Sequence, residues 1–159
     1  MRIRVLAVMF FAYMSLIPVF SQAATTIDDP LKFVSTVYAN LGKDQNYSVP
    51  SDFYTQRLTE LFALEKKEAG GEVGRMDFDF WTNAQDYQLS GLKVSMKPVE
   101  NATDRQIIIA QFKNGGKYEE IHLYFERVNN RWLLDDARSV QGEQWTLSLI
   151  LKYGWDGKS

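Results

Sequence analysis

The hydrophobic positions of the chain follow two periods, a helical period in the first half and a strand-like period in the second. Between residues 29 and 70, apolar side chains recur every three or four positions, as in amphipathic helices. Asp29, followed by proline, predicts the start of a first helix, and Gly42 predicts its end. Ser51 is the expected N-cap of a second, longer helix that includes Phe53 and Tyr54 and ends at Gly70 and Gly71.

The second half alternates between apolar and polar positions, which is typical of half-buried strands. Turn signals rich in asparagine and glycine separate four such stretches, near residues 92–97, 106–113, 118–127 and 131–137. A last periodic stretch, 143–153, predicts a short helix. Because short turns favour sequential antiparallel pairing, we expect an α+β fold. In this fold, two N-terminal helices pack on a four-stranded antiparallel meander and cover its apolar face.

The N-terminus has the pattern of a cleaved signal peptide. Two arginines precede an apolar run over residues 5–20, shorter than the roughly 20 residues that span a membrane. Small residues then occupy the A-x-A-like positions of residues 21–23. We therefore expect residues 1–23 to be removed during export through the general secretory route. Residues 24–159 would remain as a single domain without a membrane anchor, in the periplasm or outside the cell.

The composition narrows the class of protein further. Of 159 residues, 45% are hydrophobic and 14% aromatic, which predicts a folded rather than a disordered chain. The absence of cysteine excludes disulfides, thiolate metal sites and lipoprotein attachment. The formal charge is -2, or about -4 without the two N-terminal arginines, so we expect no nucleic-acid partner. With no phosphate loop or dinucleotide fingerprint either, we expect no cofactor.

Four polar residues in the segment between the helices and the strands form the strongest local candidate for a binding site: Asp77, Asp79, Gln85 and Asp86. Closely spaced carboxylates can bind a cation or share a proton. The spacing does not match an EF-hand, and we expect no metal. The structural alternative is that these side chains cap loop amides, while the neighbouring aromatic residues anchor the loop on the core.

The string from Arg75 to Asp86, together with the string from Arg131 to Arg138, resembles the bacterial exported family called domain of unknown function 3828. The first string matches through the four candidate residues and the second through Trp132, Leu134 and Asp136. Phe80 stands where proline is common in the family. The resemblance implies export and a cone-like fold of the nuclear transport factor 2-like superfamily. It implies no reaction and no catalytic residue.

The sequence leaves three functions open. The first is a binding or interaction module of the envelope, with an envelope protein or a small ligand as partner and with Asp136 as a further candidate binding residue. The second is an immunity protein that neutralises a periplasmic toxin, since acidic surfaces can steer onto basic sites. The third, by analogy of fold, is an isomerase- or hydratase-like enzyme that pairs Asp86 or Asp136 with Tyr38 or Tyr54. His122, the only histidine, accompanies no nucleophile signature or metal-ligand spacing.

Overall fold

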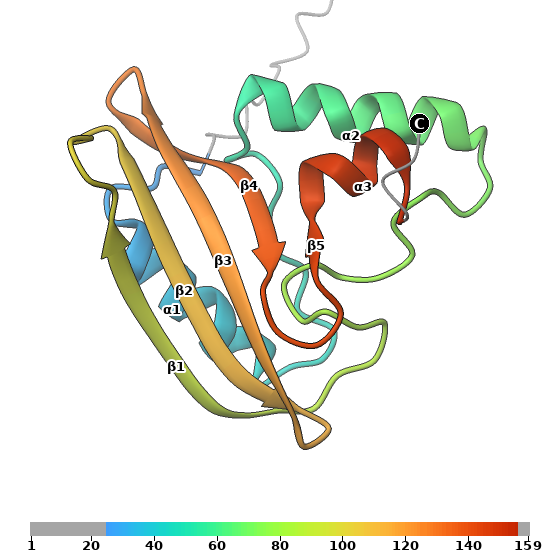
Figure 1. Ribbon diagram of the computed structural model, residues 1–159, viewed down its shortest axis with the longest axis horizontal. Coiled ribbons are helices and arrows are strands. Elements are labelled where there is room, and N and C mark those ends of the chain that lie inside the picture. The colour runs from blue at the N-terminus through green and yellow to red at the C-terminus, as the bar shows by residue number, and fades with distance from the viewer. Residues whose placement is uncertain (1–24, 156–159) are drawn as a thin grey trace, which may run out of the picture.

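The computed structural model describes residues 25–155 and has the expected α+β architecture (Figure 1). The predicted signal peptide, residues 1–23, lies outside the described residues. The elements follow one another as α1 (Pro30–Leu41), α2 (Gln56–Ala69), β1 (Leu89–Pro98), β2 (Arg105–Asn114), β3 (Lys117–Val128), β4 (Arg131–Ser139), β5 (Trp145–Thr146) and α3 (Leu147–Tyr153).

The strands form one open antiparallel sheet in the order β1-β2-β3-β4-β5. The prediction of four strands is therefore one short, and the last helix begins four residues later than expected. Trp145 is paired with Ser139, and its indole N–H donates to Asn83 Oδ1 at 2.7 Å. These bonds hold the chain extended, so the helical spacing of Trp145 and Leu149 does not extend the helix back to residue 143.

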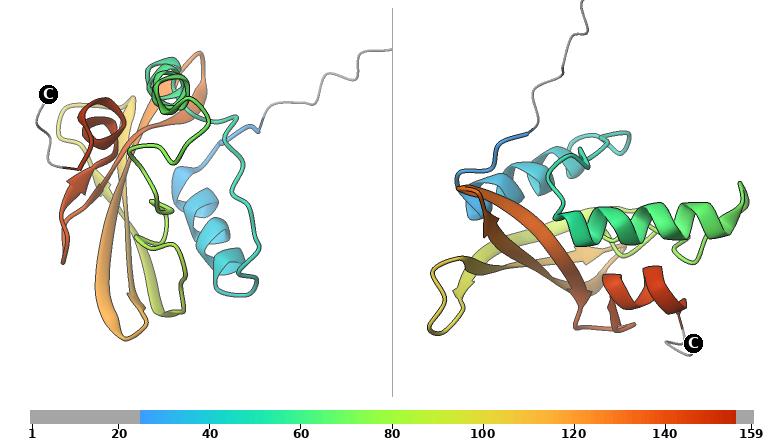
Figure 2. Two further views of the ribbon diagram at one scale, coloured as in Figure 1. Left: turned by 90° about the vertical axis from the view of Figure 1, so that its right-hand side faces the viewer. Right: turned by 90° about the horizontal axis from the view of Figure 1, so that it is seen from above.

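Helix α1 covers β1 and β2, as the sequence predicts for the first helix (Figure 2). Its N-cap is Asp29, whose carboxylate accepts from Lys32 N at 3.1 Å, and its C-cap is Gly42. The buried face carries Pro30, Val34, Val37, Tyr38 and Leu41. These side chains meet the apolar face of the sheet, to which β2 contributes Ile108, Ala110 and Phe112.

Helix α2 differs from its prediction in both start and position. Its N-cap is Thr55, which accepts from Leu58 N at 3.2 Å, and not Ser51. Phe53 and Tyr54 lie before the helix instead, because the backbone of residues 53–55 bonds to Leu134 on both sides: Leu134 N donates to Phe53 O and Thr55 N donates to Leu134 O.

The second helix also does not cover the sheet face as expected. It packs against α3 and the neighbouring β4, away from β1 and β2 (Figures 1 and 2). Only Leu58 of α2 is fully buried. Part of the apolar sheet face must therefore be covered by something other than a helix.

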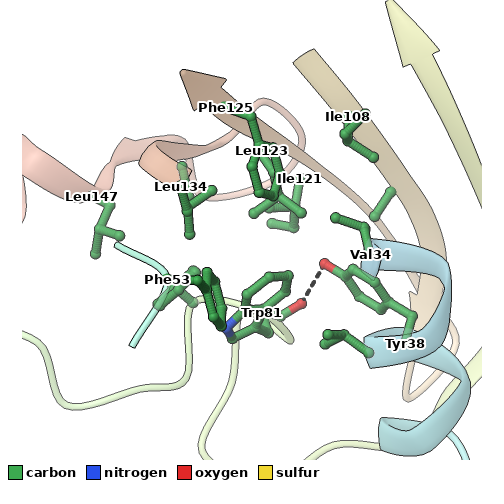
Figure 3. Packing of buried hydrophobic residues seen from close by; sticks show 14 of the residues in the cluster. Val34, Tyr38, Phe53, Trp81, Ile108, Ile121, Leu123, Phe125, Leu134 and Leu147 are labelled. Carbon is green, nitrogen blue, oxygen red and sulfur yellow. Dashed lines mark hydrogen bonds between the residues drawn. The ribbon is translucent and has the colours of Figure 1, made fainter. Parts of the chain in front are cut away.

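The loop between α2 and β1 supplies this cover. Phe80 and Trp81 are 4% and 2% exposed, and Figure 3 shows Trp81 between Phe53 and Tyr38, facing the sheet residues. The Tyr38 hydroxyl donates a hydrogen bond of 2.8 Å to Trp81 O, 43 residues away in sequence. This buried bond fixes the loop against α1.

We expect Tyr38→Phe to lower the free energy of unfolding by about 1–2 kcal/mol, because it leaves a buried carbonyl without its donor. Urea denaturation followed by tryptophan fluorescence measures the change. Tyr153→Phe is the matched control, since its hydroxyl makes no hydrogen bond within residues 25–155. An equal loss in the two variants would show that the Tyr38–Trp81 bond does not stabilise the fold.

Candidate functional site

An open cavity of about 440 Å³ lies beside the buried loop. We call it the aromatic pocket. It is formed by the segment 45–49 after α1, by Tyr54 just before α2, by Phe62 in the middle of α2 and by the loop that carries Asp79. The side chains used below are Tyr54, Phe62, Met76, Asp79 and Trp81. Phe62 and Tyr54 stack with ring centroids 5.4 Å apart and ring planes inclined by 16°, which gives the pocket a flat apolar wall.

Local backbone bonds place Asp79 at the pocket. Its carboxylate Oδ1 accepts from Trp81 N at 2.8 Å, while its own N–H donates to Ala84 O at 3.1 Å. Asn83 closes the turn with a φ of 54°, a left-handed conformation that asparagine tolerates. The turn therefore presents the Asp79 side chain next to the buried Trp81.

The Asp79 carboxylate is half-buried and uncompensated. Burial raises its pKa, against the opposing effect of the bond from Trp81 N–H. None of the four ion pairs in residues 25–155 includes Asp79. Burial raises the pKa of Tyr38 and of Tyr54, and the negative charge of Asp79 raises both pKa values further. Asp79 thus supplies a negative charge beside a cluster of aromatic side chains.

Trp81, which also lines the pocket, has an indole N–H without a partner. Nε1 is buried and makes no hydrogen bond within the part of the chain that the structure describes. In Figure 3 it lies on the side of the ring away from Tyr38, next to Phe53. The Tyr54 hydroxyl is close enough for Trp81 to lower its pKa, against the larger effect of burial, yet the two do not complete a hydrogen bond. An unsatisfied buried donor lowers the stability of the fold, so a residue that carries one beside a cavity is a candidate for ligand binding.

The other three residues of the aspartate-rich candidate lie apart from the aromatic pocket. Asp77, Gln85 and Asp86 are exposed, and none of them forms a hydrogen bond with Asp79 in residues 25–155. Asp86 lines a different, polar cavity of about 450 Å³. In the described part of the chain, no group of three histidine or acidic side chains could hold a metal ion.

The fifth candidate, Asp136, caps a helix. Its Oδ2 accepts from Ser148 Oγ at 2.6 Å and its Oδ1 from Ser148 N at 3.0 Å, in the first turn of α3. The residue at the N-cap position of that helix, Thr146, makes no side-chain capping bond. Asp136, which lies on β4, therefore caps α3 in place of a residue next to the helix. This structural role explains the carboxylate without a bound ligand.

Asp135 is the extra residue of a bulge in β4, where Tyr124 pairs with Asp136 but Phe125 pairs with Leu134. Burial disfavours its ionised form, but the bonds from Arg57 and Thr55 and the charge of Arg57 outweigh burial and lower its pKa. Asp135 thus has the cationic partner that Asp79 lacks.

His122 contacts a residue on its own strand, and Trp155 contacts a residue of the loop between α2 and β1. His122 Nε2 lies 2.7 Å from Glu120 Oε1, two residues away on the same strand. Trp155 packs against Phe78 of the loop between α2 and β1, with ring centroids 5.1 Å apart, and remains 41% exposed.

Sequence reasoning selected Asp79 but missed Phe62, Met76 and the indole of Trp81 as parts of one site. The adjacent Phe80-Trp81 pair is the available signal, because aromatic residues beside a carboxylate can bury it. Their convergence with α2 has no sequence signature, since it depends on the position of residues 53–55.

Comparisons with protein-family models, curated proteins and solved structures found no match for this chain. The resemblance to the exported family therefore remains a prediction that rests on the two sequence strings. No helix within residues 25–155 is long and apolar enough to cross a membrane.

We expect Asp136→Ala to lower the free energy of unfolding by about 1–2 kcal/mol, because α3 loses the acceptor for its first turn. Asp86→Ala, which removes an exposed carboxylate, is the matched control and should change stability little. Chemical denaturation monitored by circular dichroism measures both. Equal stability of the Asp136→Ala variant and the unsubstituted protein would contradict a capping role.

Replacing Asp79 or Asp135 by asparagine should change the melting temperature Tm in opposite directions. The raised pKa of Asp79 means that folding favours its protonated form, so its ionisation costs stability as the pH rises. Asp79→Asn, which keeps the acceptor for Trp81 N, should therefore raise Tm at pH 7. The lowered pKa of Asp135 means that its ionised form stabilises the fold, so Asp135→Asn should lower Tm at pH 7.

The difference for Asp79→Asn should shrink as the pH falls toward about 4, the ordinary aspartate pKa, because the folded-state pKa of Asp79 lies above that value. The difference for Asp135→Asn should shrink only as the pH falls below about 4, because the folded-state pKa of Asp135 lies below it. Thermal unfolding of the three proteins between pH 3 and pH 7 measures the effect. A loss of stability in Asp79→Asn at pH 7, as large as that in Asp135→Asn, would mean that the Asp79 charge is compensated.

Proposed function

We propose that this protein is an exported binding module of the bacterial envelope and that the aromatic pocket is its site for a small ligand. The signal-peptide pattern and the resemblance to an exported family support export. The open sheet with its helices on one side and at one end is compatible with the cone-like fold that this resemblance implies. The binding role rests on the pocket itself.

The observation that carries the proposal is that Asp79, a half-buried carboxylate without a cation, and Trp81, whose buried Nε1 has no hydrogen-bond partner, line one cavity with an aromatic wall. A volume of about 440 Å³ is within the range of small-molecule sites, which combine apolar walls with a few polar groups that orient the ligand. A folded chain rarely leaves a buried donor without a hydrogen-bond partner beside a half-buried carboxylate without a cation, unless something else binds them.

In the polar cavity beside Asp86, side-chain amides are hydrogen-bonded within the fold. Asn83 Nδ2 donates to Glu119 Oε2 at 2.9 Å and Asn114 Nδ2 donates to Thr82 O at 3.2 Å. These bonds tie the loop to the sheet and leave those amides engaged. The side-chain amides of that cavity are therefore hydrogen-bonded within the fold, whereas the indole N–H of Trp81 in the aromatic pocket is not.

A binding role also fits better than the enzyme alternative. Asp136 is engaged by Ser148, and the Tyr38 hydroxyl is engaged by Trp81 O. The exposed Asp86 forms no hydrogen bond with either Tyr38 or Tyr54 within residues 25–155. The aspartate–tyrosine pairs that proton transfer would need are thus not assembled.

We expect Phe62→Ala to weaken ligand binding at least tenfold, because it removes half of the stacked wall. Ligand-observed NMR with a fragment set of aromatic amines, aromatic acids, alcohols and sugars measures this. Leu64→Ala on the same helix is the matched control, since Leu64 is 40% exposed and does not line the pocket.

At least one fragment class should bind the unsubstituted protein and the Leu64→Ala variant and lose binding to Phe62→Ala. Circular dichroism of both variants checks that they are folded. Absence of binding by every class, or equal binding to the two variants, would contradict a small-ligand role for the pocket.

A further inference from the structure

We propose that the ligand of the aromatic pocket is an organic cation, a protonated or quaternary amine attached to an apolar group. This inference rests on the proposed function and names the chemical class of ligand. It follows from the charge of Asp79, from the rings around it and from the absence of a competing cation within the described chain.

The first step is that Asp79 differs from three other partly buried carboxylates, Asp135, Asp136 and Glu120. Asp135 is paired with Arg57 at 2.8 Å, and Asp136 accepts two bonds from Ser148. Glu120 accepts from Gln111 and contacts His122. Asp79 accepts a single backbone bond, so most of its acceptor capacity is open.

The second step is the electrostatic environment. The chain places no lysine or arginine in an ion pair with Asp79 in residues 25–155. The other side chains that line the pocket are uncharged and include several aromatic rings, and the face of such a ring carries the negative end of the aromatic quadrupole. An anionic ligand would face this carboxylate and these ring faces, whereas a cation would be attracted by both.

The third step is the shape of the wall. Tyr54 and Phe62 present a stacked pair at the pocket. The cation–π contacts within the described chain involve Trp132, Tyr124 and Tyr153, none of which lines the pocket. The pocket rings are therefore not occupied by an internal cation, and an ammonium group beside an apolar body fits both the rings and the carboxylate.

The fourth step is the orientation of the ligand. Trp81 Nε1 can only donate a hydrogen bond, so it calls for an acceptor on the ligand. A molecule with an ammonium group toward Asp79 and an oxygen acceptor toward Trp81 would satisfy both groups at once. The simplest probes carry the ammonium group alone, because the Asp79 contact is the charged one.

Isothermal titration at pH 7 with three probes of similar size tests the charge requirement: phenethylammonium, the neutral 2-phenylethanol and the anionic 3-phenylpropanoate. We expect phenethylammonium to bind the unsubstituted protein at least tenfold more tightly than 2-phenylethanol. We expect no measurable binding of 3-phenylpropanoate. Weaker or equal binding of phenethylammonium relative to either other probe, including no binding, would overturn the inference.

Asp79→Asn should reduce phenethylammonium binding to the level of 2-phenylethanol, because it removes the charge and keeps the shape. Asp77→Asn is the matched control, since it removes an exposed carboxylate two residues away, and its affinity should stay within about twofold of the unsubstituted protein. Equal losses in the two variants would mean that the cation senses only the net charge, which overturns the proposed site.

The indole N–H signal of Trp81 in a ¹⁵N–¹H spectrum places the probe. It should shift on addition of phenethylammonium in the unsubstituted protein and not in Asp79→Asn. If aromatic alcohols or sugars bind through Phe62 while the ammonium probe has no advantage, the organic-cation inference fails and the small-ligand function stands. If no fragment binds, the small-ligand function itself fails.

Discussion

The burial of Trp81 between α1 and the sheet is the contact on which the rest of the structure depends. Helix α1 has 12 residues and covers β1 and β2, while α2 and α3 pack together beside β4. The apolar face between them needs another cover, and the loop that carries Phe80 and Trp81 provides it. The hydrogen bond from Tyr38 to Trp81 O ties this cover to α1. Without cysteine, the chain has no disulfide to hold the loop, so packing and this bond must do so.

The same arrangement fixes the chemistry of the aromatic pocket. Because Trp81 is buried in the core, its backbone N–H lies within hydrogen-bond distance of the Asp79 carboxylate and holds that carboxylate beside the pocket. The carboxylate is half-buried as a consequence of loop packing, and its charge remains uncompensated there. The cost of this arrangement to stability is what a ligand cation would offset, so the binding proposal and the stability account rest on one structural cause.

The local parts of the fold were predictable from sequence, because their signals lie within a few residues. Asp29 and Gly42 mark the ends of α1, and the alternating stretches correspond to the four long strands. The start of α2 and the short strand β5 were not predictable, since long-range bonds from Leu134 and Asn83 hold those segments out of the helices against their helical spacing. The candidate site shows the same division. Asp79 could be selected by its type and neighbours, but its wall of Tyr54 and Phe62 comes from residues 17 and more positions earlier.

The central claim is that Asp79 is a desolvated carboxylate without a cationic partner in the unliganded protein. Carbon-detected NMR titration of the aspartate carboxyl groups measures this directly, with Asp135 as an internal reference. The account predicts that Asp79 titrates above the ordinary aspartate range and Asp135 below it. A pKa for Asp79 at or below that of Asp135 would contradict the account, because it would mean that the charge is already compensated within the folded chain.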